Sequence, residues 1–400
     1  MDTTGAGVLG AARALRDSSA QILSSIVRIP SFSGKEEAVC RAIADLCREA
    51  RFDEVRFDGL GSVVARVGHG PRTLAIDAHV DTVGVGDRTR WEEDPFSGII
   101  RDGLVLGRGT SDQKGGAAAM ITAGRMLKES GYDGVFSVLF TFTVLEEDCD
   151  GLCWRYLIER EGIRPELAVS TEPTSCRLYR GQRGRMEIQA SVRGVSAHGS
   201  APERGQSAAY KAARAALSIE RLNQELPSDD FLGKGTVVVS RVEAHGPSQC
   251  AVPDLGSLYL DRRLTAGETS EKALAEVRRA MGKDAEDVAL PRYEGTGWTG
   301  ERYSQDLYFP TWTVPLEHPL VAGGSRAYRA LFGRQPEIGR WTFSTNGVAI
   351  CGYHGIPCIG FGPGDEEQAH APNERTRIDD LVTAAAFYAM LPIALEIKAD

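Results

Sequence analysis

The 400-residue sequence lacks several features that mark common classes of protein. Its 46 basic residues are outnumbered by 55 acidic ones and no basic run compensates, which argues against a nucleic-acid partner. No uninterrupted apolar run approaches the roughly 20 residues that a membrane helix needs. The first ten residues carry an acid at position 2 and no basic segment, so they do not resemble a secretory signal. We therefore expect a cytoplasmic protein with neither a nucleic-acid nor a membrane partner.

The motifs of two large hydrolase classes are also missing. None of the seven histidines is followed by glutamate, so H-E-x-x-H is absent, and there is no G-x-S-x-G turn for a serine nucleophile. The eight cysteines are scattered and, without an export signal, are typical of free thiols. A glycine-rich run at 107–116 contains K-G-G rather than the G-K-[ST] of a phosphate loop. A tight turn that brings the backbone and Asp112 into a site explains this run better.

Length and patterning predict two domains. Four hundred residues exceed what one hydrophobic core usually organises. Over residues 1–183, helical spacing, which predicts a first helix over 6–28, alternates with β-rich runs such as Val135–Val144; this alternation is typical of a layered α/β/α domain. Residues 184–293 instead follow a β-α-β-β-α order with alternating apolar and polar positions, which predicts an inserted α+β sandwich. The first domain is expected to resume over 294–400, with a loop at 294–316 and a helix at 319–332.

Predicted strands of the first domain end in side chains that can bind metal. The run T-L-A-I-D-A-H-V-D-T-V places His79 and Asp81 two residues apart, on one face of a strand end. The next strands lead into Glu146 and Glu147 and then into Glu172, and a later apolar run leads through glycines to His370. Taken alone, Asp81 and the pair Glu146 and Glu147 have a plainer explanation, because acids often cap helices or open their first turn. Four such ends together indicate a site at one edge of the sheet.

These motifs resemble the acetylornithine deacetylase, succinyl-diaminopimelate desuccinylase and glutamate carboxypeptidase family of di-zinc metallohydrolases. The sequence around T-F-S-T-N-G and I-G-F-G-P-G-D-E is most similar to that of a branch whose name links it to selenium metabolism. The resemblance covers nearly the whole chain. It rests on H-V-D at 79–81, G-R-G-T-S-D-Q-K-G-G at 107–116, L-E-E at 145–147, T-E-P-T at 171–174, G-V-S-A-H-G-S-A-P at 194–202 and A-H-A-P-N-E at 369–374.

The resemblance implies a role for each residue of the centre. Asp112 would bridge two divalent metal ions, zinc first and cobalt or manganese as alternatives. The remaining ligands would be His79 and Glu172 on one ion, and Glu147 and His370 on the other. Glu146 would be the general base acting on a metal-bridging hydroxide, and Asp81 would orient His79. The family also implies a cis peptide bond between Asp112 and Gln113.

Substrate contacts and oligomeric state are implied in the same way. His198, in the inserted domain, would stabilise the oxyanion, often from the partner of a homodimer formed through that domain. Arg263 would bind a substrate carboxylate, and Thr345 and Asn346 are plausible substrate contacts. Two departures weaken this part of the resemblance. Cys250 stands where the family commonly has asparagine, and F-S-T-N replaces the usual glycine-rich substrate loop.

The predicted activity is hydrolysis of an amide bond in an N-acyl amino acid or small peptide, of the deacylase or carboxypeptidase type. A dipeptidase or a carbamoyl-amino-acid hydrolase on the same scaffold is the alternative. Within the family, the second of these usually has histidine where this chain has Glu172. A catalytically silent metal-binding homologue is a further hypothesis, but Glu146 and every predicted ligand are present.

Overall fold

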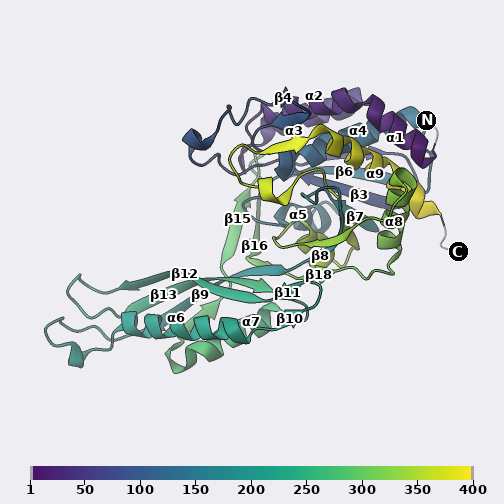
Figure 1. Ribbon diagram of the computed structural model, residues 1–400. Coiled ribbons are helices and arrows are strands. Elements are labelled where there is room, and N and C mark those ends of the chain that lie inside the picture. Colours follow the sequence, from purple (N-terminus) through teal and green to yellow (C-terminus); the bar gives the residue numbers. More distant parts are fainter. Residues whose placement is uncertain (1–2, 398–400) are drawn as a thin grey trace.

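The computed structural model describes residues 3–397, which form a large domain and a smaller inserted one (Figure 1). The core of the large domain joins residues from Val8 to Tyr179 with residues from Tyr303 to Ala394. The inserted domain has a separate core, drawn from residues between Met186 and Val288. Two hydrophobic cores within one chain fit the two domains expected from its length, and the mixed α/β architecture is as predicted.

The large domain is built on a nine-stranded sheet over the described residues. Its order is β1-β2-β6-β3-β7-β20-β8-β18, and β19 pairs with β8. The central strands β6, β3, β7 and β20 run parallel to one another. The nine strands are β1 (Glu54–Phe57), β2 (Val63–Val67), β3 (Arg72–His79), β6 (Phe136–Thr143), β7 (Leu167–Ser170), β8 (Leu178–Gln182), β18 (Trp312–Thr313), β19 (Ile338–Trp341) and β20 (Cys358–Gly360).

Helices cover this sheet, and a small sheet lies beside them. The small sheet consists of β4 (Ile99–Arg101), β5 (Leu104–Leu106) and β21 (Arg375–Arg377). The helices are α1 (Gly5–Ala14), α2 (Arg16–Val27), α3 (Glu37–Glu49), α4 (Gly115–Ser130), α5 (Leu152–Glu159), α8 (Pro319–Phe332) and α9 (Ile378–Glu396). Small residues let α4 approach the sheet closely: a Cβ on Gly116 would lie 2.1 Å from Thr171 Oγ1.

The C-terminal helix α9 is long and apolar enough to cross a membrane by those two criteria alone. It is nevertheless a core helix, because 72% of its apolar window is buried inside the protein. It packs against α1, α2, α4 and α8. The apolar character of α9 is therefore accounted for by the core of the large domain.

The inserted domain is a sheet covered by two helices, below the large domain in Figure 1. Its strand order is β12-β13-β9-β14, and a short strand, β17, also pairs with β9. Helices α6 and α7 pack together, and α6 packs on the sheet. The elements are β9 (Gly184–Arg193), α6 (Ala208–Glu225), β10 (Ser228–Asp229), β11 (Gly233–Lys234), β12 (Thr236–His245), β13 (Leu255–Leu264), α7 (Ser270–Met281), β14 (Asp287–Ala289) and β17 (Tyr308–Phe309).

Two local predictions were wrong. The predicted helix over residues 6–28 is two helices that meet at Leu15. The segment 294–316, predicted as a loop, begins within a hairpin of β15 (Arg292–Thr296) and β16 (Arg302–Asp306). Contacts with the large domain hold this hairpin, since Trp298 Nε1 donates to the carbonyl of Gly61 at 3.0 Å. Such tertiary contacts do not appear in a local sequence pattern.

Candidate metal centre

The sheet topology brings the predicted strand ends together. Because β6, β3, β7 and β20 are adjacent and parallel, their carboxyl ends open at one edge of the sheet. His79 is the last residue of β3, Glu146 follows β6, and Glu172 follows β7. His370 comes from the loop after β20, and Asp112 lies in the turn that precedes α4. Side chains from five separate segments thus converge on one place.

Two groups of possible metal ligands result, and Asp112 belongs to both. His79, Asp112 and Glu172 form the first, in which His79 Nε2 lies 3.0 Å from Asp112 Oδ1 and 3.8 Å from Glu172 Oε1. Asp112, Glu147 and His370 form the second, in which His370 Nε2 lies 3.0 Å from Glu147 Oε2 and 3.4 Å from Asp112 Oδ2. The two oxygens of Asp112 therefore face different groups. The peptide bond between Asp112 and Gln113 is cis, as expected.

Asp81 contacts both halves of this centre. His79 Nδ1 lies 3.0 Å from the backbone carbonyl of Asp81 and 3.5 Å from its carboxylate Oδ1. The other carboxylate oxygen accepts hydrogen bonds from Ser33 Oγ at 2.7 Å and from the backbone N–H of Glu147 at 3.0 Å. The closest contact to His79 is thus through the main chain of Asp81, while its carboxylate fixes the backbone of Glu147.

Glu146 is buried beside the first group without being part of it. Its Oε2 lies 3.9 Å from His79 Nε2, and its Oε1 has no hydrogen-bond partner among the described residues. A buried carboxylate oxygen without a partner is costly, and such groups are concentrated at functional sites. Glu146 can therefore accept a proton from a molecule that enters the site.

The electrostatics of the centre fit a site for cations. Burial raises the pKa of Glu146 and Glu172 well above the usual range, and raises that of Glu147 to about 7. Hydrogen bonds to Asp112 and Glu147 raise the pKa of His370 to about 10. Keeping these buried carboxylates ionised therefore costs free energy, and bound divalent cations would offset that cost. Histidine and carboxylate donors are a set that zinc, cobalt and manganese all accept.

No role was predicted for Glu374, although it lies in the A-H-A-P-N-E motif at 369–374. It is fully buried. Its Oε1 accepts from the backbone N–H groups of Ser111 and Asp112 at 2.7 and 3.0 Å. Its Oε2 accepts from Arg108 Nη1 at 2.7 Å and from the N–H of Gly109 at 2.9 Å. Glu374 therefore holds the turn that presents Asp112.

Lys114, in the same turn, is not available for phosphate. Its side chain is fully buried, and Nζ donates to the carbonyls of Ile26, in the last turn of α2, and Ile29, just after that helix, at 3.1 and 2.8 Å. Burial lowers its pKa to about 7. These contacts agree with the prediction that the glycine-rich run at 107–116 forms a tight turn and not a phosphate loop.

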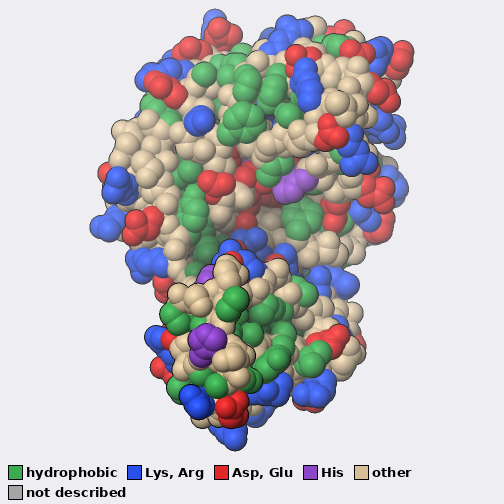
Figure 2. All heavy atoms as spheres, turned by 90° about the vertical axis from the view of Figure 1, so that its left-hand side faces the viewer, with side chains coloured by type: hydrophobic (Ala, Val, Ile, Leu, Met, Phe, Trp, Pro, Cys, Tyr) green, Lys and Arg blue, Asp and Glu red, His purple; other side chains and the backbone are tan. Residues whose placement is uncertain are grey.

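The centre opens into a cavity of about 360 Å³ between the two domains. Figure 2 shows acidic side chains in the hollow of the large domain and basic side chains on the facing part of the inserted domain. The cavity is lined from the large domain by Asp112, Glu146, Glu147, Glu172 and His370, and from the inserted domain by Arg185 and Arg263. Arg263 is held by two hydrogen bonds to Asp261, at 2.8 and 3.0 Å. The predicted carboxylate-binding residue thus reaches the site.

Thr345 and Asn346, predicted as substrate contacts, are fully buried behind this cavity. Thr345 donates to Gln182 Oε1 at 2.5 Å, and Asn346 Nδ2 donates to Asp77 Oδ2 at 2.9 Å. Phe343 and Ser344 line the cavity instead. The geometry therefore does not support the two predicted contacts, because both side chains are engaged with protein partners.

His198 is exposed on the inserted domain and is not among the described residues that line the cavity. Its Nδ1 lies 2.7 Å from Ser200 Oγ, and the neighbouring Gly199 donates to the carbonyl of Cys250 at 2.9 Å. A role for His198 in the reaction would need a second chain or a movement of the inserted domain.

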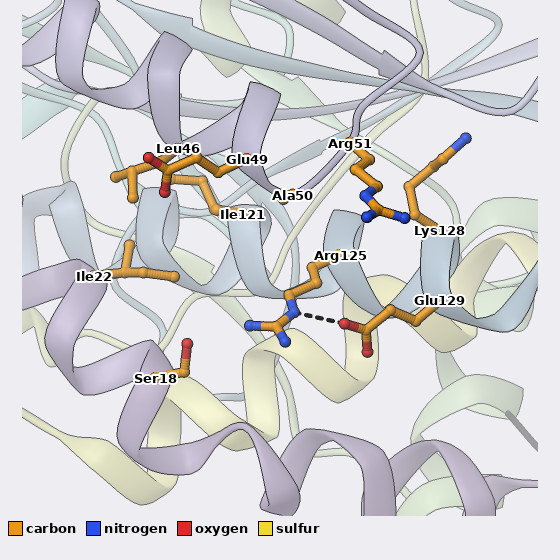
Figure 3. A pocket seen from close by; sticks show the side chains of 10 residues that line it. All are labelled: Ser18, Ile22, Leu46, Glu49, Ala50, Arg51, Ile121, Arg125, Lys128 and Glu129. Carbon is orange, nitrogen blue, oxygen red and sulfur yellow. Dashed lines mark hydrogen bonds and ion pairs between the residues drawn. The ribbon is translucent and has the colours of Figure 1, made fainter.

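A second cavity, of about 670 Å³, lies between α2, α3 and α4 (Figure 3). Its apolar lining residues include Ile22, Leu46 and Ile121, and two further lining residues, Arg125 and Glu129, pair at 2.7 Å. None of the metal-ligand groups found among the described residues lies there. The smaller cavity at the sheet edge is the candidate site because it holds the convergent acids and histidine.

Comparison with known proteins identifies the family. A family model described as Peptidase family M20/M25/M40 matches residues 75–393. The chain belongs to this peptidase family. Membership indicates a hydrolase, and the matched range contains every residue of both candidate ligand groups.

Relatives of this peptidase family match over almost the whole chain. A curated relative, "Uncharacterized protein YgeY" from Escherichia coli K12, is 51% identical over 376 residues, which cover 94% of this chain and 93% of the relative. The aminopeptidase PepT from Bacillus cereus has a TM-score of 0.73 at 22% identity, covering 95% of this chain and 98% of PepT. The YXEP protein of Bacillus subtilis, described as a dinuclear metal binding peptidase, has a TM-score of 0.69 at 15% identity, covering 95% and 98%. These structural likenesses show a shared fold.

Proposed function

We propose that this protein uses two divalent metal ions to hydrolyse an amide bond in an N-acyl amino acid or small peptide, as a deacylase or carboxypeptidase. The observation that carries the proposal is the pair of ligand groups that share Asp112, with Glu146 unpartnered beside them. The acetylornithine deacetylase group, and within it the selenium-linked branch, is the part of the family to which we assign the chain. A cytoplasmic location is part of the proposal and is supported by eight free cysteines.

The ligand groups specify which residues would hold each ion. His79, Asp112 and Glu172 would bind one, and Asp112, Glu147 and His370 the other. Zinc is the proposed ion, with cobalt or manganese as alternatives. When bound, two divalent ions supply Lewis acidity towards a carbonyl and make water easier to deprotonate.

The chain's own residues would move the protons and position the substrate. Glu146 would accept a proton from the attacking water at its unpartnered Oε1 and pass it to the leaving nitrogen. Asp81 would keep His79 in place through the 3.0 Å contact with Nδ1. Arg263 would bind a substrate carboxylate, since its charge faces the cavity from the inserted domain. His198 would stabilise the oxyanion by hydrogen bonding.

Because His198 is exposed, we also propose that two copies pair through the inserted domain. Among the described residues β12 is an edge strand, paired on one side only, by β13. It exposes Val238 and Val242, and the neighbouring helix α6 exposes Tyr210 and Leu217. An open edge with apolar side chains is a surface that proteins usually cover.

A hydrolysis screen tests the proposed function. The purified protein would be incubated, with and without added zinc, cobalt or manganese, with N-acyl amino acids, dipeptides and carbamoyl amino acids, and products would be followed by mass spectrometry. We expect metal-dependent cleavage of N-acyl amino acids or peptides, and Glu146→Gln should keep its metal but lose turnover by about 10²–10⁴-fold. A metal-loaded protein that cleaves nothing in the panel would support a silent homologue. Unchanged turnover in Glu146→Gln would remove it as the base.

A further inference from the structure

Arg185, on β9 of the inserted domain, lines the cavity without using its hydrogen-bonding capacity. A guanidinium carries five N–H donors. None of them makes a hydrogen bond with a described residue. The guanidinium is held by charge and packing instead: Nε lies 3.5 Å from Asp150 Oδ2, Nη2 lies 3.5 Å from Glu187 Oε1, and the guanidinium carbon lies 4.5 Å from the centre of the Phe309 ring. The neighbouring Arg263, which lies opposite Arg185 across β9 and β13, makes two hydrogen bonds to Asp261. Arg185 therefore lines the cavity with N–H donors that no hydrogen bond to a described residue satisfies.

Asp150, on the large domain, faces Arg185 and forms an ion pair with it, without a hydrogen bond. Its Oδ2 is buried without a hydrogen-bond partner and lies 3.5 Å from Arg185 Nε. Its backbone is fixed, because Gln305 Nε2 donates to its carbonyl at 3.1 Å. The two side chains come from different domains, and both line the cavity that holds the candidate metal ligands. A donor and an acceptor thus lie side by side, paired by charge but with no hydrogen bond on either atom.

The charges around Arg185 disfavour an anion there. Asp150 and Glu187 both lie 3.5 Å from its guanidinium, so its positive charge is already balanced. A carboxylate of the substrate would meet two protein carboxylates. The surroundings of Arg263 differ, because three guanidinium groups, those of Arg183, Arg263 and Arg340, act on one another there, and Asp261 is the carboxylate that pairs with Arg263. Positive charge is therefore in excess around Arg263, whereas two carboxylates balance the charge of Arg185.

We propose that Asp150 and Arg185 together select an uncharged substrate group that has a carbonyl oxygen beside an N–H, a carboxamide being the simplest. Arg185 would donate to the carbonyl, and Asp150 would accept from the N–H. With a carboxylate at Arg263, the substrate class becomes small polar amides that carry one carboxylate and one neutral carboxamide-type group. This rests on the proposed hydrolase function. The scarcity of apolar lining agrees with it, since Phe343 and Ala369 are the two apolar residues among the twelve that line the cavity.

Matched substrate pairs test the proposal. One pair is N-acetylglutamine and N-acetylglutamate, and the other is N-succinamoyl-alanine and N-succinyl-alanine, which move the carboxamide to the acyl side. The metal-loaded wild type should favour the carboxamide in at least one pair by tenfold or more in kcat/KM. Asp150→Asn should shift that ratio at least tenfold towards the carboxylate, because the new side chain removes a negative charge and can donate. Arg185→Gln and Arg185→Lys should both lose the preference, while the exposed Arg292→Gln should keep it.

Binding of product amino acids separates this proposal from the hydrolase function. Calorimetry should show that glutamine binds more tightly than glutamate if the carboxamide lies on the amine side, and that Arg185→Gln removes the difference. If no amide is cleaved but this Arg185-dependent binding is found, the hydrolase proposal fails and the selectivity stands. Cleavage with equal kcat/KM within both pairs would overturn the selectivity. So would Asp150 and Arg185 variants that are less stable to heat but keep the wild-type ratios, because the pair would then only join the two domains.

Discussion

Replacing Glu374 by glutamine should destabilise the turn that presents Asp112. Each carboxylate oxygen of Glu374 accepts two hydrogen bonds: Ser111 and Asp112 donate to Oε1, and Arg108 and Gly109 donate to Oε2. A glutamine has one acceptor oxygen, so in either orientation its NH₂ group faces two donors. Two hydrogen bonds to a charged acceptor are lost, each contributing about 1.5–3 kcal/mol. We expect the free energy of unfolding of the large domain to fall by about 3 kcal/mol or more.

The assay is urea unfolding of the metal-free protein, followed by elemental analysis after metal loading. Glu301→Gln is a matched control, because this exposed glutamate lies in the β15–β16 hairpin, and it should change the unfolding free energy by less than about 0.5 kcal/mol. Glu374→Gln should also bind metal more weakly, since both ligand groups depend on Asp112. Wild-type stability together with wild-type metal content would refute the role assigned to Glu374.

Three further results are expected. His370→Ala should lose one of two bound ions by elemental analysis, and full occupancy would contradict its assignment as a ligand. His198→Ala should lower kcat by about 10²–10³-fold with metal content intact, and an unchanged rate would leave His198 a surface residue. Metal binding should release protons and tighten as pH rises from about 6 to 8, because Glu147 and His370, with pKa values raised to about 7 and about 10, must deprotonate to bind. Calorimetry in two buffers of different ionisation enthalpy measures the release, and pH-independent affinity with none released would count against these ligands.

Much of the fold could be predicted because the relevant signals are local. The β-rich run that became β6 and the helical spacing of α7 and α8 needed no knowledge of the rest of the chain. The candidate ligands could be predicted because parallel strands place their carboxyl ends at one edge, so His79 and Glu172 converge from β3 and β7.

The remaining features depend on contacts between distant segments. Nothing in the sequence around Asn346 shows that its amide donates a hydrogen bond to Asp77, which is 269 residues away. The same holds for Glu374, which accepts from Asp112 across 262 residues. Short polar segments look alike whether they face substrate or support the backbone, so burial decides between the two roles. The A-H-A-P-N-E motif was the one sequence signal that pointed to Glu374, but within this motif the metal-ligand role was assigned to His370 alone.

The most direct test of the two-metal centre is the number of divalent ions bound per chain in the wild type and in Asp112→Ala, measured by titration and elemental analysis. Asp112 is the residue shared by both ligand groups. Two ions are predicted for the wild type, and loss of tight binding at both sites is predicted for the variant. A wild-type chain that binds no divalent ion under loading conditions, or an Asp112→Ala chain that keeps both ions, would contradict the account.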